Sequence, residues 1–292
     1  MVIIHQMAKV GSTAIQQALQ RAGIESLQTH NLGEHHLQNN LASFLSSFYT
    51  LQRVRNELGL FKDQIIATKL LDIARQPGSP KQKLITLSRD PARRWFSALI
   101  QNYAFLQPKV DEFYEAQQGK KPASASESFD YIFTTLLNLV NSSEHKLGSH
   151  EFNEFFWNSR HTENEDINKV ILLVGAELLV PFTWFQTNIH ELIDLDIYAQ
   201  PVENGMLVTG NEHFKLLYIK FENLKRDRAL TSRALTEFLD KKIKMKPANV
   251  SKGKAGFDII KPLEDKYYSQ FMSCANIKTS DYCRHFNYPE QA

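Results

Sequence analysis

The sequence predicts an α/β fold with a central parallel sheet and helices on both of its faces. Strand-like runs alternate with segments of helical periodicity, and this alternation is typical of parallel strands joined by crossover helices. The chain has 292 residues, 42% of them hydrophobic, which is enough for a substantial core, and we expect a single domain over residues 1–292. The strand-like runs are Val2–His5, Ser26–Thr29, Gln64–Thr68, Lys83–Ser88 and Lys215–Phe221.

The first predicted strand leads into a loop that is suited to hold an anion. The loop consists of Lys9, Val10, Gly11, Ser12 and Thr13 and precedes an amphipathic helix. Gly11 allows a tight turn, and Ser12 or Thr13 can cap the helix, whose first N–H groups then point at the anion. Lys9 adds a mobile positive charge. Because the lysine precedes the glycine and an earlier glycine is absent, the loop does not follow the Walker A pattern of ATPases and kinases.

A second anion signal follows the strand Lys83–Ser88. Arg89 lies at the carboxyl end of that strand, where open α/β sheets bind ligands, and Pro91 begins the next helix. Ser97 lies about two turns along this helix, and a guanidinium with a hydroxyl makes a good second grip on a phosphate. The alternative is that Arg89 pairs with a carboxylate such as Asp90 while Ser97 faces water.

A third and weaker signal lies near the C-terminus. Lys252, Gly253 and Lys254 form a glycine-containing basic loop after a lysine-rich helical segment. The backbone of such a loop can fold over an anion, and its lysines can neutralise the charge. A solvated loop is the alternative interpretation.

The other segments are expected to build the body of the fold. Residues 103–165 are predicted to be a helical and loop insertion over the sheet, with an apolar helix near Tyr131–Val140. The apolar run Val170–Phe185 is too short to span a bilayer comfortably, and we expect it to form core elements that break near Pro181.

Composition limits the partners and the compartment. A formal charge of +2, from 34 basic and 32 acidic residues, gives no global basic field, so we expect no nucleic-acid partner. Cys274 and Cys283 are too few for a disulfide framework and are typical of a reducing compartment, although a single disulfide is possible. The chain begins almost directly with a strand, without room for a leader. We therefore expect a cytoplasmic protein without a transmembrane segment.

Taken in order, the three anion signals resemble the sulfotransferases that use 3′-phosphoadenosine 5′-phosphosulfate (PAPS). In that family the N-terminal loop, here Lys9 to Thr13, holds the 5′-phosphosulfate. An arginine and a serine eight residues later, here Arg89 and Ser97, hold the 3′-phosphate. A basic glycine-containing loop, matched by Lys252, Gly253 and Lys254, covers the nucleotide.

The resemblance extends over nearly the whole chain. The family's Tyr-Glu-Asp-Leu segment reads Phe221-Glu222-Asn223-Leu224 here, so Phe221 keeps an aromatic face for adenine but lacks the hydroxyl. Thr183-Trp184-Phe185 and His285-Phe286 look like the branch described as capsular polysaccharide synthesis proteins. The resemblance implies a three-layer fold like that of P-loop NTPases, with residues 103–165 on the acceptor side. It also implies sulfuryl transfer to a hydroxyl, with a carbohydrate as acceptor, in polysaccharide biosynthesis.

Sulfuryl transfer needs charge stabilisation on the leaving phosphate and a base for the attacking hydroxyl, and by this logic it requires no metal. Lys9 is the candidate that neutralises the leaving oxygens. His30 follows the strand Ser26–Thr29 and titrates near neutral pH, so it suits the base. Asp72, after the run Gln64–Thr68, could serve instead or orient a histidine. His5, inside the first strand, is expected to be a packed core residue.

Two other functions stay open. One is a nucleotide kinase or NTPase on the same fold, which the absent Walker A pattern disfavours. The other is a non-catalytic module that binds a nucleotide or a glycan. A metal site at Glu34, His35 and His36 is not expected, because adjacent histidines point to different sides and no cysteine cluster accompanies them.

Overall fold

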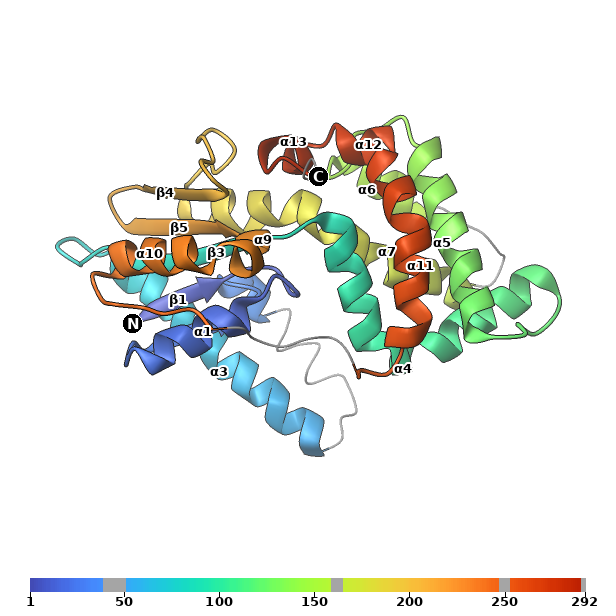
Figure 1. The fold of residues 1–292 in the computed structure, drawn as a ribbon, viewed down its shortest axis with the longest axis horizontal. Helices are drawn as coiled ribbons and strands as arrows, with labels where there is room; N and C mark the ends of the chain where they lie inside the picture. Colours follow the sequence, from blue (N-terminus) through green and yellow to red (C-terminus); the bar gives the residue numbers. More distant parts are fainter. Residues whose placement is uncertain (39–50, 159–164, 247–252, 290–292) are drawn as a thin grey trace. The chain divides into compact units, whose positions relative to one another are not determined.

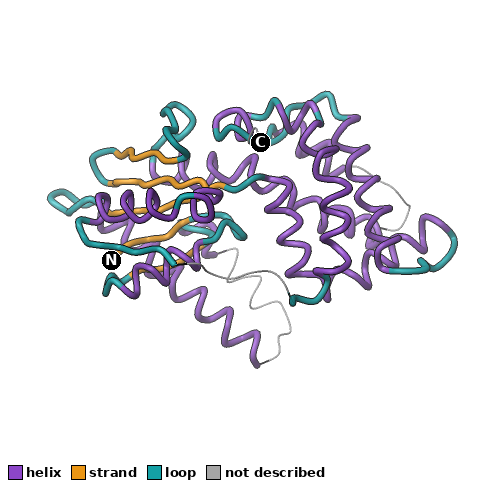
Figure 2. Tube along the Cα trace, viewed as in Figure 1, coloured by secondary structure: helices purple, strands orange, loops and turns teal. Residues whose placement is uncertain are grey.

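The computed structural model describes residues 1–38, 51–158, 165–246 and 253–289 (Figure 1). Its internal contacts define two compact units. The sheet unit comprises Met1–Arg89 and Trp184–Asn249, and the helical unit comprises Asp90–Thr183 and Val250–Ala292. All strands of the described residues belong to the sheet unit (Figure 2). The expected single domain stays a prediction.

The sheet unit has a five-stranded mixed sheet with strand order β2-β1-β3-β5-β4. The four neighbours β2, β1, β3 and β5 are parallel, and β4 pairs with β5 in the antiparallel direction at the edge. The α/β fold class is therefore confirmed, with one antiparallel strand that the sequence did not predict. The strands are β1 (Val2–His5), β2 (Ser26–Thr29), β3 (Gln82–Ser88), β4 (Met206–Gly210) and β5 (Phe214–Lys220).

The order of the parallel strands places helices on both faces of the sheet. The chain moves outward from β1 to β2 through α1 (Ser12–Arg21) and then returns across β1 to β3 through α3 (Leu51–Ala74). Because such crossovers are right-handed and these two run in opposite directions, α1 and α3 lie on opposite faces. On the face of α1, Lys241, just after α10 (Arg228–Leu239), donates to the carbonyl of Gly23 at 3.3 Å, and Figure 1 shows α10 in front of the strands.

One predicted strand is wrong, because residues 64–68 lie inside the helix α3. The buried side chains of its second half are spaced by three or four residues, so they form a helical stripe rather than an alternating strand face. A short apolar run does not distinguish a strand from a buried helix turn, and here the packing decides for the helix. The buried residues are Phe61, Gln64, Ala67, Thr68, Leu71 and Ala74.

The helical unit is built around an aromatic core. The Trp95 ring lies 5.0 Å from Phe133 and 4.7 Å from Phe271, centroid to centroid, and its Nε1 donates to the carbonyl of Val174 at 2.8 Å. Both cysteines are buried and free, and burial raises the pKa of Cys274 to about 11. The helices are α4 (Pro91–Gln118), α5 (Ala125–Ser142), α6 (His150–Asn158), α7 (Glu165–Phe185), α11 (Phe257–Ser273), α12 (Ala275–Lys278) and α13 (Asp281–His285). The last two residues of α7 belong to the sheet unit.

Pro91 begins α4, as predicted. Asp90 is the N-cap residue, and its carboxylate accepts from the backbone N–H of Arg93 at 2.9 Å. The same carboxylate accepts from the hydroxyl of Tyr268 on α11 at 2.7 Å, so the cap also links two helices of this unit.

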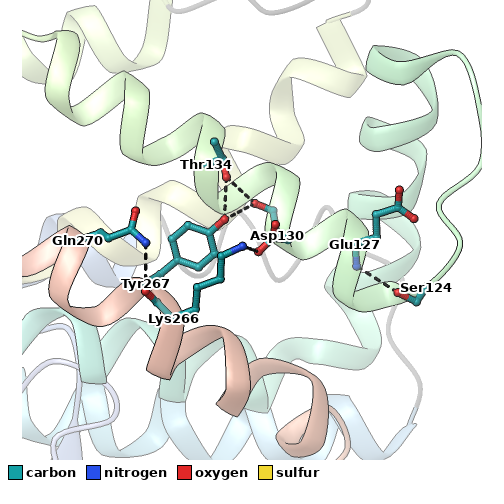
Figure 3. A network of polar contacts seen from close by, with 7 residues as sticks. All are labelled: Ser124, Glu127, Asp130, Thr134, Lys266, Tyr267 and Gln270. Atoms are coloured by element: carbon teal, nitrogen blue, oxygen red, sulfur yellow. Dashed lines mark hydrogen bonds and ion pairs between the residues drawn. The ribbon is translucent and has the colours of Figure 1, made fainter.

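A polar network joins α5 to α11 (Figure 3). Tyr267 OH lies 2.7 Å from Thr134 Oγ1 and donates to the carbonyl of Asp130 at 3.1 Å, while Lys266 pairs with the Asp130 carboxylate at 2.6 Å. Ser124 caps α5 by accepting from the N–H of Glu127 at 3.3 Å. The described part of residues 103–165 is thus helical between its turns and is tied to the C-terminal helices.

The expected break near Pro181 is wrong, since Pro181 lies inside α7. The helix continues into a π-helical turn, η1 (Gln186–His190), and α8 (Glu191–Ile193). Burial of apolar side chains such as Val174, Leu178 and Phe185 compensates for the hydrogen bond that proline removes. Among the described residues, the segment Lys169–Ile193 is long and apolar enough to cross a membrane. However, 56% of its apolar 18-residue stretch is buried inside the protein, as in a core helix.

Candidate anion site

The candidate site lies at the carboxyl edge of the sheet, where the direction of winding reverses. The crossovers from β1 and from β3 leave in opposite directions, so the ends of these two neighbouring strands lie at the topological switch point, the usual ligand position in open α/β sheets. The loop of Lys9 follows β1, Arg89 follows β3, and Phe221 follows β5, the next strand. Three of the predicted elements therefore emerge from adjacent strands.

The loop presents the N-terminus of α1 without a side-chain cap. Gly11 is the N-cap residue with φ 85°, and Lys9 also has a positive φ of 69°. The first turn of α1 carries no acidic residue, so the positive end of the helix dipole is not offset locally. The prediction that Ser12 or Thr13 caps the helix is wrong, because Ser12 is the first helical residue and its hydroxyl accepts from Gln6 Nε2 at 3.0 Å.

Gly11 is required by packing as well as by its backbone angle. A Cβ at this position would lie 2.6 Å from the Phe221 ring and 3.0 Å from Leu224. Phe221 begins α9 (Phe221–Arg226), so the start of α9 packs directly on the start of α1. The ring predicted to face adenine therefore also shapes the anion loop.

Arg89 connects the same two segments. Its Nη1 donates to the backbone carbonyl of Lys9 at 2.8 Å, and its guanidinium carbon lies 4.5 Å from the centroid of the Phe221 ring. Lys225 Nζ lies 5.2 Å from the same ring. Asp90, the predicted alternative partner of Arg89, accepts from the N–H of Arg93 and caps α4, and the pairing of Arg89 with Asp90 stays a prediction. Cationic side chains thus gather around Phe221 beside the helix N-terminus, a suitable environment for a phosphate or sulfate.

His30 lies next to the loop. Its Nδ1 is 2.9 Å from the backbone carbonyl oxygen of Gln6, and its own carbonyl accepts from Trp184 Nε1 at 3.3 Å. A carbonyl oxygen only accepts, so Nδ1 carries the hydrogen in that contact and Nε2 carries the lone pair of the neutral ring. In that tautomer Nε2 has no hydrogen and can accept a proton, as a general base must.

His5 is a core residue, as predicted. It is fully buried, its Nε2 lies 3.1 Å from the carbonyl oxygen of Asn188, and its ring lies 4.8 Å from that of Trp184. Burial lowers its pKa from 6.5 to about 3. The ring is therefore neutral at physiological pH and contacts η1 through Asn188 as well as the ring of Trp184.

Asp72 does not lie at the end of a strand. It is on α3, half exposed, and pairs with Lys69 at 3.1 Å and Arg75 at 3.8 Å. Arg75 lies over the ring of Phe214, the first residue of β5, so this end of α3 is at the amino edge of the sheet. The strand that supported Asp72 as a base is absent, and its catalytic role stays a prediction without that support.

The remaining predicted residues lie partly in the Lys9 loop and partly in the helical unit. Val10 is fully buried and Thr13 is exposed within the loop region. Ser97 is half-buried on α4 of the helical unit, and Gly253 and Lys254 precede α11 in the same unit. Lys252 lies outside the described residues. The roles of Ser97 and of the basic loop therefore stay predictions.

Sequence reasoning missed Gln6, which contacts both Ser12 and His30. The rule that selected Arg89 and His30, a polar residue directly after a strand, would also have selected Gln6. Its amide is unremarkable in sequence because glutamine matches no phosphate or catalytic motif.

Within the described residues, no group of three or more His, Cys, Asp or Glu side chains is placed to hold a metal ion. The donors that are gathered, a helix N-terminus, a lysine and an arginine, are those that bind oxyanions. Comparison with protein-family models, curated proteins and solved structures finds no match. The interpretation of this site therefore depends on its own geometry.

We expect Gly11→Ala to destabilise the protein more than Gly78→Ala. Both glycines have a positive φ, 85° and 80°, but a Cβ at Gly78 meets nothing within 4 Å. The left-handed backbone should lower the free energy of unfolding by about 1–2 kcal/mol in both variants. The contact with Phe221 should add about 1–3 kcal/mol in Gly11→Ala alone. Urea unfolding measures both, and equal losses would show that the close approach is unimportant.

We expect His5 to make the protein acid-sensitive. Burial lowers its pKa from the ordinary 6.5 to about 3 in the fold, so between these pH values the unfolded chain binds a proton that the folded protein does not. The free energy of unfolding should then fall with falling pH by about 1.4 kcal/mol per pH unit from this group. His5→Gln should lack this contribution, so its unfolding free energy should vary less between pH 6.5 and lower pH. Parallel slopes for the two proteins would contradict the assignment.

Proposed function

We propose that this protein is a PAPS-dependent sulfotransferase that transfers a sulfuryl group to a hydroxyl acceptor. The observation that carries the proposal is the gathering of the Lys9 loop, Arg89 and Phe221 at the ends of three adjacent parallel strands. In the family that the sequence resembles, the matching elements hold the 5′-phosphosulfate, the 3′-phosphate and the adenine. A generic phosphate loop would explain only the first of them.

The residues fit an anionic nucleotide. The start of α1 has no side-chain cap, so its first backbone N–H groups can bind an anion. Gly11 has no Cβ, which allows the Phe221 ring to pack against the loop. Lys9 and Arg89 both supply positive charge, and the Arg89 guanidinium is held at the loop by its hydrogen bond to the backbone carbonyl of Lys9. The aromatic ring of Phe221 lies beside Arg89 and Gly11, so a base and its phosphates would find stacking and charge in one place.

The chain's own groups can perform the steps of a transfer. The acceptor oxygen forms a bond to the sulfur as the bond from sulfur to the 5′-phosphate oxygen breaks, and the hydroxyl proton passes to the base. His30 Nε2 takes that proton, with the ring held through Nδ1 by the carbonyl of Gln6. Lys9 and the N–H groups of the loop stabilise the negative charge that grows on the leaving phosphate.

The acceptor class comes from the family resemblance, which implies a carbohydrate in polysaccharide biosynthesis. Acceptor recognition is assigned to the helical segment 103–165, whose described part belongs to α4, α5 and α6. A cytoplasmic location and the absence of a membrane anchor belong to the same proposal.

We expect Lys9→Ala and Arg89→Ala each to lower kcat/KM for transfer from labelled PAPS by about 100-fold or more, because the first removes charge stabilisation of the leaving phosphate and the second removes the charged contact with the 3′-phosphate. Arg284→Ala is the matched control, since it removes an exposed arginine that pairs with Asp281 elsewhere. Circular dichroism checks that all three variants are folded.

Undiminished transfer in both loop variants would contradict the assignment. Magnesium-dependent ATP hydrolysis that needs Lys9 would instead support an NTPase or kinase. Tight calorimetric binding of 3′-phosphoadenosine 5′-phosphate, without transfer to any hydroxylated acceptor, would support a binding module.

We expect His30→Gln to lower kcat by about 10²–10⁴-fold, the range for loss of a general base. Asp72→Asn should keep near wild-type transfer, because Asp72 pairs with Lys69 and Arg75 on α3. Single-turnover transfer from labelled PAPS measures the chemical step. The reverse result would assign the base to Asp72.

A further inference from the structure

Gln6 occupies a fixed position between the strand β1 and the anion loop. It is fully buried and directly follows β1, and its backbone N–H donates to the carbonyl of Thr29 at 3.2 Å. Thr29 is the last residue of β2, and His30 follows it. The sheet therefore fixes the backbone of Gln6 and the backbone before His30 relative to each other.

The side-chain amide of Gln6 bridges two predicted site residues. Its nitrogen donates to Ser12 Oγ at 3.0 Å and lies 3.1 Å from His30 Nδ1. Ser12 is buried and is the first residue of α1, so its hydroxyl lies beside the N–H groups that face the anion. Because Nδ1 donates to the backbone carbonyl of Gln6, the amide N–H meets the ring as a second donor, so a change at Ser12 that turns the amide alters the electrostatic environment of the imidazole directly.

The burial and length of the Gln6 side chain make methionine the suitable test replacement. Gln6 Oε1 is buried and has no hydrogen-bond partner among the described residues. Burying an amide oxygen in this way destabilises a fold, and a methionine would fill a similar volume without that penalty.

We infer that Gln6 is a positioning residue that links the anion loop to the His30 imidazole, so that an anion bound at the start of α1 changes the environment of the base. The inference rests on the proposed site and adds a coupling between its donor side and its acceptor side. Ser12 transmits the change because its hydroxyl contacts the amide directly. The contact between Ser12 and Gln6 is rigid because both side chains are buried.

Nuclear magnetic resonance of the full chain tests the link without any transfer reaction. The protein is labelled with ¹⁵N, inorganic sulfate is the probe, and the ring nitrogens of His30 are assigned by their loss in His30→Gln. In the wild type, sulfate should shift the amide signals of Gly11 to Thr13 and the ring signals of His30 together. In Gln6→Met the loop should still shift, while the response of His30 should be lost.

Gln82→Met is the matched control. Gln82 is a buried glutamine at the start of β3 whose amide contacts the carbonyls of Met1 and Lys83, away from the loop. This variant should keep the wild-type response. Ser12→Ala removes the hydroxyl that contacts the Gln6 amide, so it should lose the His30 response as well. If Gln6→Met does not fold, Ser12→Ala alone tests the link.

The outcomes separate the link from the site. Loop shifts with an unchanged His30 response in Gln6→Met, or in Ser12→Ala, would overturn the link and leave the proposed function standing. An absence of sulfate-induced shifts at Gly11 to Thr13 in the wild type would overturn the anion site and the link together. Loss of the His30 response in both variants, with Gln82→Met unaffected, supports the link.

Discussion

The candidate site depends on the close approach of two helix starts. Gly11 is the N-cap residue of α1 and Phe221 begins α9, and no Cβ fits between them. Arg89 completes this contact, because its guanidinium lies over the Phe221 ring while it donates to the carbonyl of Lys9. One aromatic ring thereby sets the positions of the loop, of the arginine and of α9. Such packing leaves little freedom for the backbone on which Lys9 is carried.

This contact is possible because of the strand order. β1, β3 and β5 are neighbours, and parallel pairing brings their carboxyl ends to the same edge. The reversal of winding between β1 and β3 keeps crossover helices from covering that edge, so the loop and Arg89 can meet there. The antiparallel strand β4 lies at the far edge and does not alter this arrangement.

Much of this arrangement could be predicted from local patterns. Four strands and the helix begun by Pro91 follow from apolar runs and from proline chemistry, and Arg89 was selected because it follows a strand. The run at residues 64–68 misled because a helix stripe and a short strand share apolar content over five residues. Asp72 was selected through that error.

Tertiary contacts explain what the sequence could not reveal. The cap at Gly11 replaces one at Ser12 because Gln6, six residues earlier, engages the serine hydroxyl. Pro181 stays inside a helix because buried apolar neighbours outweigh one lost hydrogen bond. In each case a partner distant in sequence or a buried surface decides, and neither is visible in a local pattern.

The two roles of Arg89 are compatible because of the shape of its side chain. A guanidinium has five N–H donors in a planar fork, and the contact with Lys9 uses Nη1. Its flat face stacks on an aromatic ring while its edge donates hydrogen bonds, which a lysine ammonium cannot reproduce. An arginine at the end of β3 can therefore brace the loop and bind an oxyanion from the same position. The contact that fixes the loop then also places a second positive group beside the start of α1.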